Sequence, residues 1–319
     1  MKKQIPGFLL MILVFLLLTG CSQKESLKPP TPGSGERGST PLLLTPTADG
    51  TGTLGNEHVS VDISHMDQGY VMLKWLEEPG MAVDGAHNAS ARIKLQITGP
   101  AHITYTYNLP SDKNWHVFPL TDGDGDYTLS IFENIQGNQY FEVFSHPLEL
   151  TLSDGLLPFL YPNEYVAYDQ NTQAVQLAEE LAADSDTDLD VIYSVFYYVV
   201  TNISYDTQKA QSVRSDYLPD VDETLASKKG ICFDYASLMT AMLRSQGIPT
   251  KLDIGYVGTV YHAWISVWVK DTGWIYNIIE FDGTTWNMMD PTLASTESQG
   301  ESIENYINND KSYFVKYSY

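Results

Sequence analysis

The pattern of apolar and polar positions changes several times along this chain, and each change predicts a different kind of segment. An unbroken apolar run extends from Phe8 to Leu18 and follows the basic pair Lys2 and Lys3. Residues 21–55 are instead rich in Pro, Gly, Ser and Thr and poor in apolar side chains. Such a composition does not offset the entropy lost on ordering, so we predict a disordered tether there.

Residues 56–155 alternate between apolar and polar positions as β-strands do. In residues 92–98, for example, Ile93, Leu95 and Ile97 share one face. Similar segments lie at residues 58–63, 70–76, 103–107, 127–132, 140–144 and 148–152. About seven short strands separated by turn-forming clusters predict a small β-sandwich of immunoglobulin-like type.

From residue 156 the apolar spacing becomes helical and then returns to strands. Residues 171–183, 189–200 and 232–246 have the spacing of helices that bury one face or more. Strand-like segments follow at residues 251–256, 262–269, 273–277 and 285–290. Helices followed by an antiparallel sheet predict an α+β domain over residues 156–319.

The first twenty residues have the features of an export signal. The apolar run of eleven residues is shorter than the ~20 needed to span a bilayer, and it follows a basic start. Leu18-Thr19-Gly20-Cys21 resembles a bacterial lipobox. The resemblance implies that residues 1–20 are a lipoprotein signal peptide, that cleavage precedes Cys21 and that lipid is attached to its thiol. We therefore predict an extracytoplasmic protein anchored in a bacterial cell membrane by this lipid.

The charge of the chain excludes several classes of partner. Its formal net charge is −22, from 40 acidic and 18 basic residues, and removal of Lys2 and Lys3 with the signal changes this to −24. Nucleic-acid binding depends on clustered Lys and Arg, and so does docking on anionic lipid. We therefore expect no nucleic-acid partner and no membrane contact except through the lipid on Cys21.

One acidic cluster resembles a calcium-binding loop. Asp122, Asp124, Asp126 and Glu133 occupy positions 1, 3, 5 and 12 of that pattern, but Tyr127 replaces the glycine required at position 6. The alternation that follows predicts a strand instead of the helix of such a site. The chain also lacks the Cys and His spacing of a zinc site. We predict a turn here, and neither a metal nor another cofactor.

Cys232 is the one thiol left when Cys21 carries lipid, because the chain has two cysteines. A free thiol is open to oxidation outside the cytoplasm, so its presence calls for an explanation. Cys232 starts the predicted helix 232–246, where the unpaired amides and the helix dipole favour a reactive thiolate and can hold an oxyanion. The alternative is a buried small apolar side chain.

His262 and Asp290 follow Cys232 in the order of a thiol acyl-transfer site. In the strand-like segment 262–269 the odd positions are apolar, so His262 and Trp264 are expected on the other face. We expect His262 to be a general base and Trp264 to line the substrate cleft; the alternative for His262 is a surface histidine. Asp290 precedes Pro291, where its carboxylate would orient the imidazole or simply begin a turn.

Four motifs in this order resemble the transglutaminase-like superfamily, which has a papain-like fold. They are Gly230-Ile231-Cys232-Phe233-Asp234-Tyr235, Arg244-Ser245-Gln246-Gly247-Ile248-Pro249, His262-Ala263-Trp264 and Trp286-Asn287-Met288-Met289-Asp290-Pro291-Thr292. The resemblance covers about residues 170–295 and implies that Cys232 is the nucleophile, His262 the base and Asp290 the orienting acid. It also implies an aromatic donor in the oxyanion hole, for which Tyr205 is the candidate; the alternative for Tyr205 is a packing role.

The predicted function is therefore thiol acyl transfer on amide bonds, through a thioester. The substrate would be a protein or peptide with a carboxamide or a peptide bond. A primary amine would complete transamidation and crosslinking, and water would complete deamidation. A cysteine peptidase or amidase acting on surface protein or cell-wall peptide is the alternative within enzymes. A non-catalytic binding module is the alternative from another class.

Overall fold

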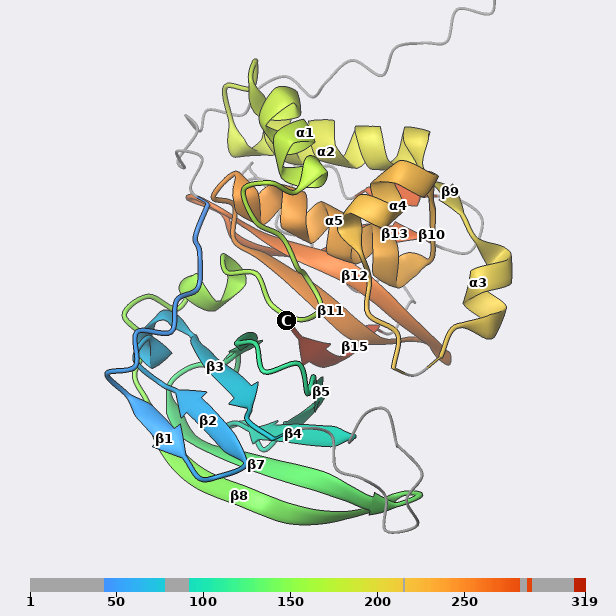
Figure 1. Cartoon of the computed structure of the whole chain (residues 1–319). Helices are drawn as coiled ribbons and strands as arrows, with labels where there is room; N and C mark the ends of the chain where they lie inside the picture. The colour runs from blue at the N-terminus through green and yellow to red at the C-terminus, as the bar shows by residue number, and fades with distance from the viewer. Residues whose placement is uncertain (1–42, 78–91, 215, 282–285, 289–312) are drawn as a thin grey trace, which may run out of the picture.

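The computed structural model describes two packed parts, an N-terminal pair of sheets and a C-terminal group of helices around a third sheet (Figure 1). The structure describes residues 43–77, 92–214, 216–281, 286–288 and 313–319. Within this part of the chain, no helix is long and apolar enough to cross a membrane. Nor do these residues contain a cluster of three or more His, Cys, Asp or Glu side chains suited to a metal ion.

The N-terminal part consists of two four-stranded antiparallel sheets. The first has the order β1 (Thr53–Gly55), β2 (Val59–Asp62), β3 (Tyr70–Trp75) and β6 (His116–Pro119). The second has the order β5 (Thr104–Leu109), β4 (Ile93–Thr98), β7 (Gly125–Gln136) and β8 (Gln139–Leu150). A 3-10 helix, η1 (Met66–Gln68), precedes β3.

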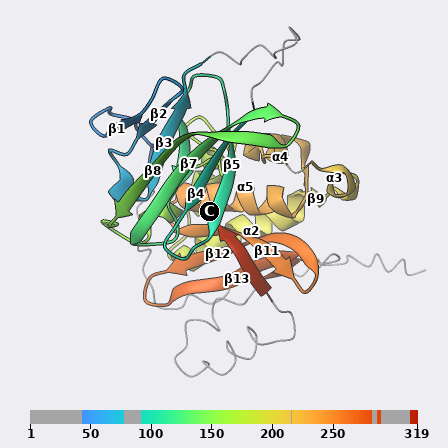
Figure 2. The same cartoon turned by 90° about the horizontal axis from the view of Figure 1, so that it is seen from below.

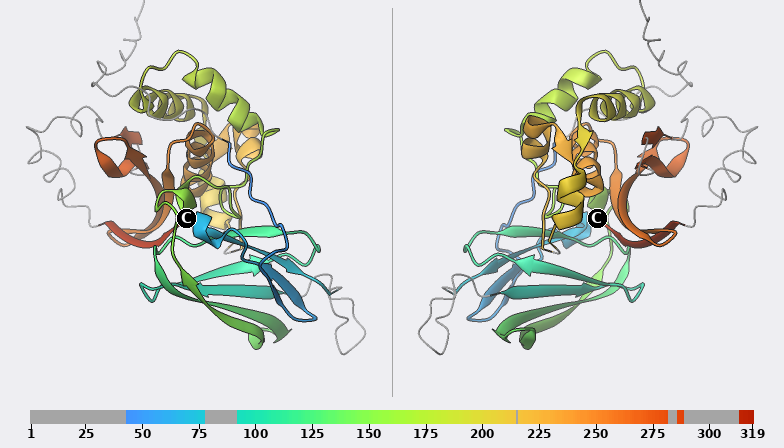
Figure 3. Two further views of the ribbon diagram at one scale, coloured as in Figure 1. Left: turned by 90° about the vertical axis from the view of Figure 1, so that its left-hand side faces the viewer. Right: turned by 90° about the vertical axis from the view of Figure 1, so that its right-hand side faces the viewer.

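The two N-terminal sheets face each other across one apolar core (Figure 3). Ile93, Leu95 and Ile97 are buried in it together with Leu73 and Trp75 of the other sheet. The predicted alternation of residues 92–98 is thereby confirmed, because these inward positions are the apolar ones. The immunoglobulin-like topology stays a prediction.

The predicted tether is wrong at its end, because residues 53–55 form strand β1. Leu54 of this strand pairs with Val61 of β2. Just before it, the N–H of Gly50 donates to the Asp62 carboxylate at 2.8 Å. Pairing with β2 satisfies the backbone N–H and C=O groups of this segment. The segment is therefore ordered although its composition is poor in apolar side chains. The acidic turn behaves as predicted and leads directly into strand β7.

The C-terminal part begins with short elements and four helices. They are η2 (Leu157–Phe159), α1 (Gln173–Ala182), α2 (Asp188–Asn202), α3 (Thr207–Ser212) and α4 (Val221–Ser227), with the parallel pair β9 (Ser204–Tyr205) and β10 (Lys229–Gly230) beside them. The fifth helix, α5 (Cys232–Ser245), is buried from Asp234 onward. Its apolar side chains pack against helices α1, α2 and α4 and against the third sheet.

The third sheet is antiparallel, with the order β14 (Trp286–Met288), β13 (Gly273–Phe281), β12 (Val260–Val269), β11 (Thr250–Val257) and β15 (Tyr313–Ser318). Helix α5 contacts β11 and β12 in the middle of this sheet. Strand β15 pairs with β11 on the side that faces β5 of the N-terminal part (Figure 2).

The two parts of the molecule touch through β15 and the residue after it. The hydroxyl of Thr121 donates to the carbonyl oxygen of Ser318 at 2.8 Å. The ring of Tyr319 lies against Tyr105 and Tyr107, with centroid separations of 5.5 and 6.0 Å. Aromatic rings at such separations contribute both buried area and favourable edge contacts. The N-terminal sheets are therefore packed onto the sheet that carries His262.

Candidate active site

Cys232 is the first residue of helix α5, as the sequence predicted. Its side chain is half-buried, and the backbone N–H groups of Phe233 and Ala263 donate to its sulfur. Phe233 belongs to the first turn of the helix, where amides have no partner within the helix. Ala263 belongs to strand β12, so the sulfur lies where helix and sheet meet.

Burial raises the pKa of the Cys232 thiol above its ordinary value, although the N–H groups of Ala263 and Phe233 oppose this shift. The Asp234 carboxylate raises it further. The expectation of a lowered pKa at the helix start is therefore wrong for this arrangement, because loss of solvent around the sulfur outweighs the helix terminus. A thiol of this kind stays protonated until a base accepts its proton.

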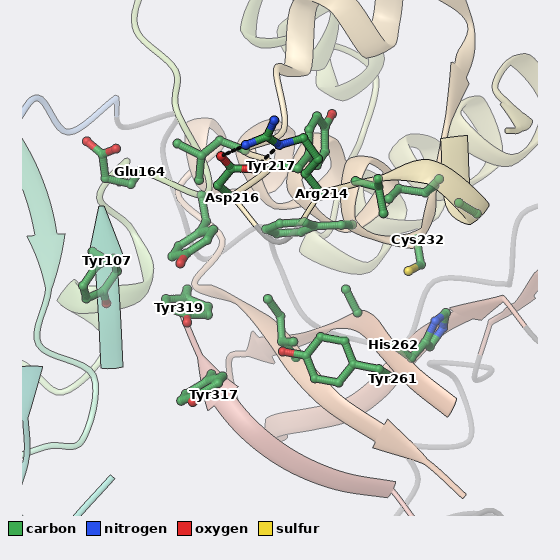
Figure 4. Close-up of a pocket in the computed structure, with 18 of the residues that line it drawn as sticks. Tyr107, Glu164, Arg214, Asp216, Tyr217, Cys232, Tyr261, His262, Tyr317 and Tyr319 are labelled. Carbon is green, nitrogen blue, oxygen red and sulfur yellow. Dashed lines mark hydrogen bonds and ion pairs between the residues drawn. The ribbon is translucent and has the colours of Figure 1, made fainter. Parts of the chain in front are cut away.

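His262 lies on β12 next to Ala263 and is half-buried. Cys232 and His262 line the same cavity, and Figure 4 shows the sulfur directed toward the side on which the imidazole lies. The imidazole stacks on Trp264 with a centroid separation of 6.3 Å and an angle of 26° between the rings. The structure thus brings the predicted nucleophile and the predicted base together.

Trp264 lies elsewhere than we expected. Its side chain is only 1% exposed and does not belong to the cavity lining. Its ring also makes a T-shaped contact with the ring of Tyr313, with the centroids 5.2 Å apart. The reason is that β12 is covered on both faces, so Ser266 on the His262 side is buried as well. Trp264 supports the imidazole from behind instead of lining the cleft.

Tyr205 lies beside Cys232. It ends strand β9 and pairs with Gly230, two residues before the cysteine. Its phenol oxygen accepts a hydrogen bond from the backbone N–H of Cys232, and burial raises its pKa. A protonated phenol beside the sulfur has the chemistry required of an oxyanion donor. Asp290 and Cys21, the remaining predicted site residues, lie outside the described residues.

A buried cluster beneath the cysteine was not predicted from the sequence. The Asp234 carboxylate is 0% exposed and accepts from the backbone N–H of Ile231 at 2.8 Å. It also accepts from Lys209 Nζ at 2.7 Å and from the hydroxyl of Tyr217. Lys209 lies 4.3 Å from the centroid of the Tyr217 ring. The position of Asp234, three residues after the helix cap, was the available signal. Its side-chain partners come from the short helix α3 (Lys209) and from the irregular segment after it (Tyr217).

The cavity has a volume of about 630 Å³ and runs between the two parts of the molecule. Seven tyrosines line it: Tyr107, Tyr165, Tyr205, Tyr217, Tyr261, Tyr317 and Tyr319. The charged side chains on its wall are already paired, because Arg214 donates to Asp216 at 3.0 Å and His116 bonds Glu164 at 2.9 Å. The cavity therefore offers aromatic faces and hydroxyls more than free charge.

The site and its helix-then-sheet order agree with a known protein family. Residues 175–277 match the model of the Transglutaminase-like superfamily. This part of the chain, which includes Cys232 and His262, is therefore similar to that superfamily. The resemblance drawn from the four sequence motifs is confirmed, as is a mixed α/β fold with a transglutaminase-like domain.

Two curated relatives match a part of this chain. A UPF0252 protein of Methanocaldococcus jannaschii is 33% identical over 25% of this chain, and the uncharacterized protein YebA of Bacillus subtilis is 29% identical over 31%. The matches span 26% and 16% of the lengths of these relatives. Each match therefore covers less than a third of this chain and a smaller part still of the relative of Bacillus subtilis.

Solved structures give weaker likenesses. A structure from Cytophaga hutchinsonii, assigned provisionally as a cysteine protease, is 15% identical with a TM-score of 0.35 over 70% of this chain and 66% of its own. Red sea bream transglutaminase is 12% identical with a TM-score of 0.23 over 70% of this chain and 48% of its own. Scores this low do not establish a common arrangement of the whole chains.

Proposed function

We propose that this protein is a cysteine-dependent acyl transferase that acts on amide bonds. The observation that carries the proposal is that Cys232 and His262, from a helix and a strand, line one cavity with an amide of β12 on the sulfur. The match of residues 175–277 to the model of the transglutaminase-like superfamily supports it.

In the proposed reaction His262 takes the proton of Cys232, and the sulfur attacks the carbonyl carbon of the substrate amide. A sulfur–carbon bond forms, the carbon–nitrogen bond breaks, and the imidazolium returns its proton to the leaving nitrogen. The product is a thioester, which a primary amine converts to a new amide or water to an acid. The raised pKa of the Cys232 thiol makes the base necessary.

Two further groups have roles in this proposal. Tyr205, which bonds the N–H of Cys232, would donate to the oxygen that becomes negative during the attack. Asp290 would accept from the far imidazole nitrogen and fix its tautomer, as the sequence motif implies. The three residues Cys232, His262 and Asp290 would then form a catalytic triad.

A cysteine peptidase or amidase is the second candidate, because the same residues cleave a peptide bond when water resolves the thioester. A non-catalytic binding module is a weaker candidate, since it has no need of a thiol and an imidazole on one cavity wall. The N-terminal sheets, which we infer to be an immunoglobulin-like sandwich, border the same cavity.

We also propose an extracytoplasmic location, with the chain held to a bacterial membrane by lipid on Cys21. The lipobox-like Leu18-Thr19-Gly20-Cys21 supports this proposal. Diacylglycerol on the thiol supplies two acyl chains, and two chains are needed for stable anchoring. A Cys21→Ser variant should be released or left unprocessed; if it still fractionates with membranes at the mature mass, the anchor lies elsewhere.

The decisive experiment incubates the chain from Ser22 onward with a glutamine-rich protein, with and without a primary amine, and follows mass changes. Transamidation increases the mass of the substrate protein by the mass of the amine minus that of ammonia. Deamidation increases it by the mass of water minus that of ammonia, and proteolysis yields fragments. Cys232→Ala and His262→Ala variants are the controls. Unchanged activity in either variant would refute the proposal.

A further inference from the structure

Strand β5 borders the cavity along an open edge. β5 is one of the two edge strands of its sheet, and it pairs with β4. Thr106 and Asn108 are exposed on one face of the strand, whereas Tyr107 is buried on the other, yet all three line the cavity. Successive side chains of a strand point to opposite faces of the sheet. Residues from both faces can therefore line the same cavity only when the cavity lies along the edge of the strand. Backbone N–H and C=O groups that pair with no other described strand therefore face the cavity.

Among the described strands, this edge lacks the protection that the other edges of the three larger sheets have. Proteins usually shield an edge strand with charges, proline or short length, because an open edge pairs with other chains. β8 contains Glu142, Pro147 and Glu149, β6 ends in proline, and β15 contains a lysine. β1 and β14 have three residues each. β5, with the sequence TYTYNL, has six residues and neither charge nor proline.

The open edge is continuous with the candidate active site. Figure 4 shows Tyr107 of β5 at one end of the cavity and Cys232 with His262 at the other, with Tyr319, Tyr317 and Tyr261 between them. Tyrosine rings contact an extended chain at small cost in conformational entropy. Because the charged groups on the wall are already paired, the cavity suits an uncharged main chain better than a charged ligand.

We propose that the substrate is an extended polypeptide segment that pairs as an additional strand with the open edge of β5 and places its reactive residue at Cys232. This inference rests on the proposed function and names its substrate class. Main-chain hydrogen bonds supply affinity in such strand addition, and alternate side chains supply specificity. The N-terminal part is then a component of the substrate site and not a spacer.

The test uses backbone methylation of the ligand, which leaves the protein unchanged. The ligand is a synthetic peptide of about ten residues, the upper end of ordinary strand length, with one central glutamine and alternating Thr and Val. Two isomers carry N-methyl groups on the odd or on the even residues. A paired strand directs alternate N–H groups to its neighbour, so one isomer should lose most of its affinity and the other should keep it. Each lost hydrogen bond should weaken binding about 2- to 10-fold.

Binding is measured by titration calorimetry with the Cys232→Ala chain from Ser22 onward, so that chemistry does not enter. Turnover of the unmethylated peptide and of N-acetylglutamine amide by the unaltered chain tests the proposed function separately. An equal loss for both isomers, or no loss for either, would overturn strand addition even if the peptide is turned over. Selective loss without turnover would uphold peptide binding and overturn the proposed reaction.

A protein variant adds a second measurement. Thr106→Glu places a charge on strand β5 without removing a backbone N–H, and should weaken binding of the peptide. Ser130→Glu, on β7 inside the same sheet, is the matched control. Equal affinity of the Thr106→Glu and unaltered chains for the peptide would also overturn the inference.

Discussion

Ala263 of strand β12 donates its backbone N–H to the sulfur of Cys232 on helix α5. Among the described residues, the pairing of β12 with β13 runs from Val269 to Ile265 and has a register shift on the way. It does not reach Ala263, which pairs with Ile254 of β11 on the other side of the strand. The neighbouring residue is His262, and the contact therefore fixes the strand that carries the base against the helix that carries the nucleophile.

The pH dependence of Cys232 alkylation tests its ionisation. Burial raises the pKa of this thiol, and only the thiolate reacts with iodoacetamide. The thiolate fraction of Cys232 is therefore small at neutral pH and grows as the pH rises through the raised pKa. The alkylation rate should rise throughout the interval from about pH 6 to about pH 10. It should not level off at a pH below the ordinary pKa of cysteine. A rate that is already constant at neutral pH would contradict the raised pKa.

Tyr205→Phe tests the proposed oxyanion donor. Removal of the hydroxyl should lower kcat on an amide substrate about 10- to 100-fold, with little change in KM, because the donor acts in the transition state. The rate of Cys232 alkylation should change far less. Tyr197→Phe, at an exposed position of helix α2, is the control and should leave kcat unchanged. A loss confined to KM would instead assign Tyr205 to ground-state binding.

Arg244 tests the packing between the two ends of the C-terminal part. Its side chain is 0% exposed and donates to the carbonyl oxygens of Thr250, Tyr161 and Tyr319, at distances from 2.6 to 2.9 Å. An Arg244→Met variant keeps apolar volume but leaves these buried acceptors unpaired. We expect the free energy of unfolding to fall by about 3 kcal/mol or more, measured by chemical denaturation. A loss below about 1 kcal/mol would contradict the assigned role.

The local pattern of apolar and polar residues predicted the helix that carries Cys232 and the strand that carries His262. The helix that starts at Cys232 was expected over residues 232–246 and spans Cys232–Ser245. The strand of His262 was expected over residues 262–269 and spans Val260–Val269. Both follow from apolar periodicity, which is a property of neighbouring residues. The strand at residues 92–98 was predictable for the same reason.

Features that depend on distant contacts were not predictable in this way. Strand β15 pairs with β11 across more than fifty residues of sequence, and the ring of its Tyr313 packs against Trp264, which was expected to line the cleft. The raised pKa of Cys232 depends on burial by several elements. The cavity between the two parts depends on how Tyr107 and Tyr319 meet. None of these relationships leaves a periodic signal in the sequence.

The cluster of Lys209, Asp234 and Tyr217 provides a last test, because it places a buried carboxylate beneath the nucleophile. Lys209 Nζ lies 2.7 Å from this carboxylate and neutralises it. Lys209→Met removes that charge, so the free energy of unfolding should fall by about 2–3 kcal/mol. Asp234 already raises the pKa of Cys232, and without its counter-ion it should raise it further. The alkylation profile should therefore shift to higher pH.

The matched control is Lys270→Met, which removes an exposed lysine at the end of β12 and should change neither measurement. Asp234→Asn in the Lys209→Met background removes the uncompensated charge while keeping an acceptor for Ile231. This double variant should return the alkylation profile of Cys232 toward that of the unaltered chain, because electrostatic repulsion is gone. A profile that stays shifted in the double variant would mean that Lys209 acts by holding helix α3 in place and not through its charge.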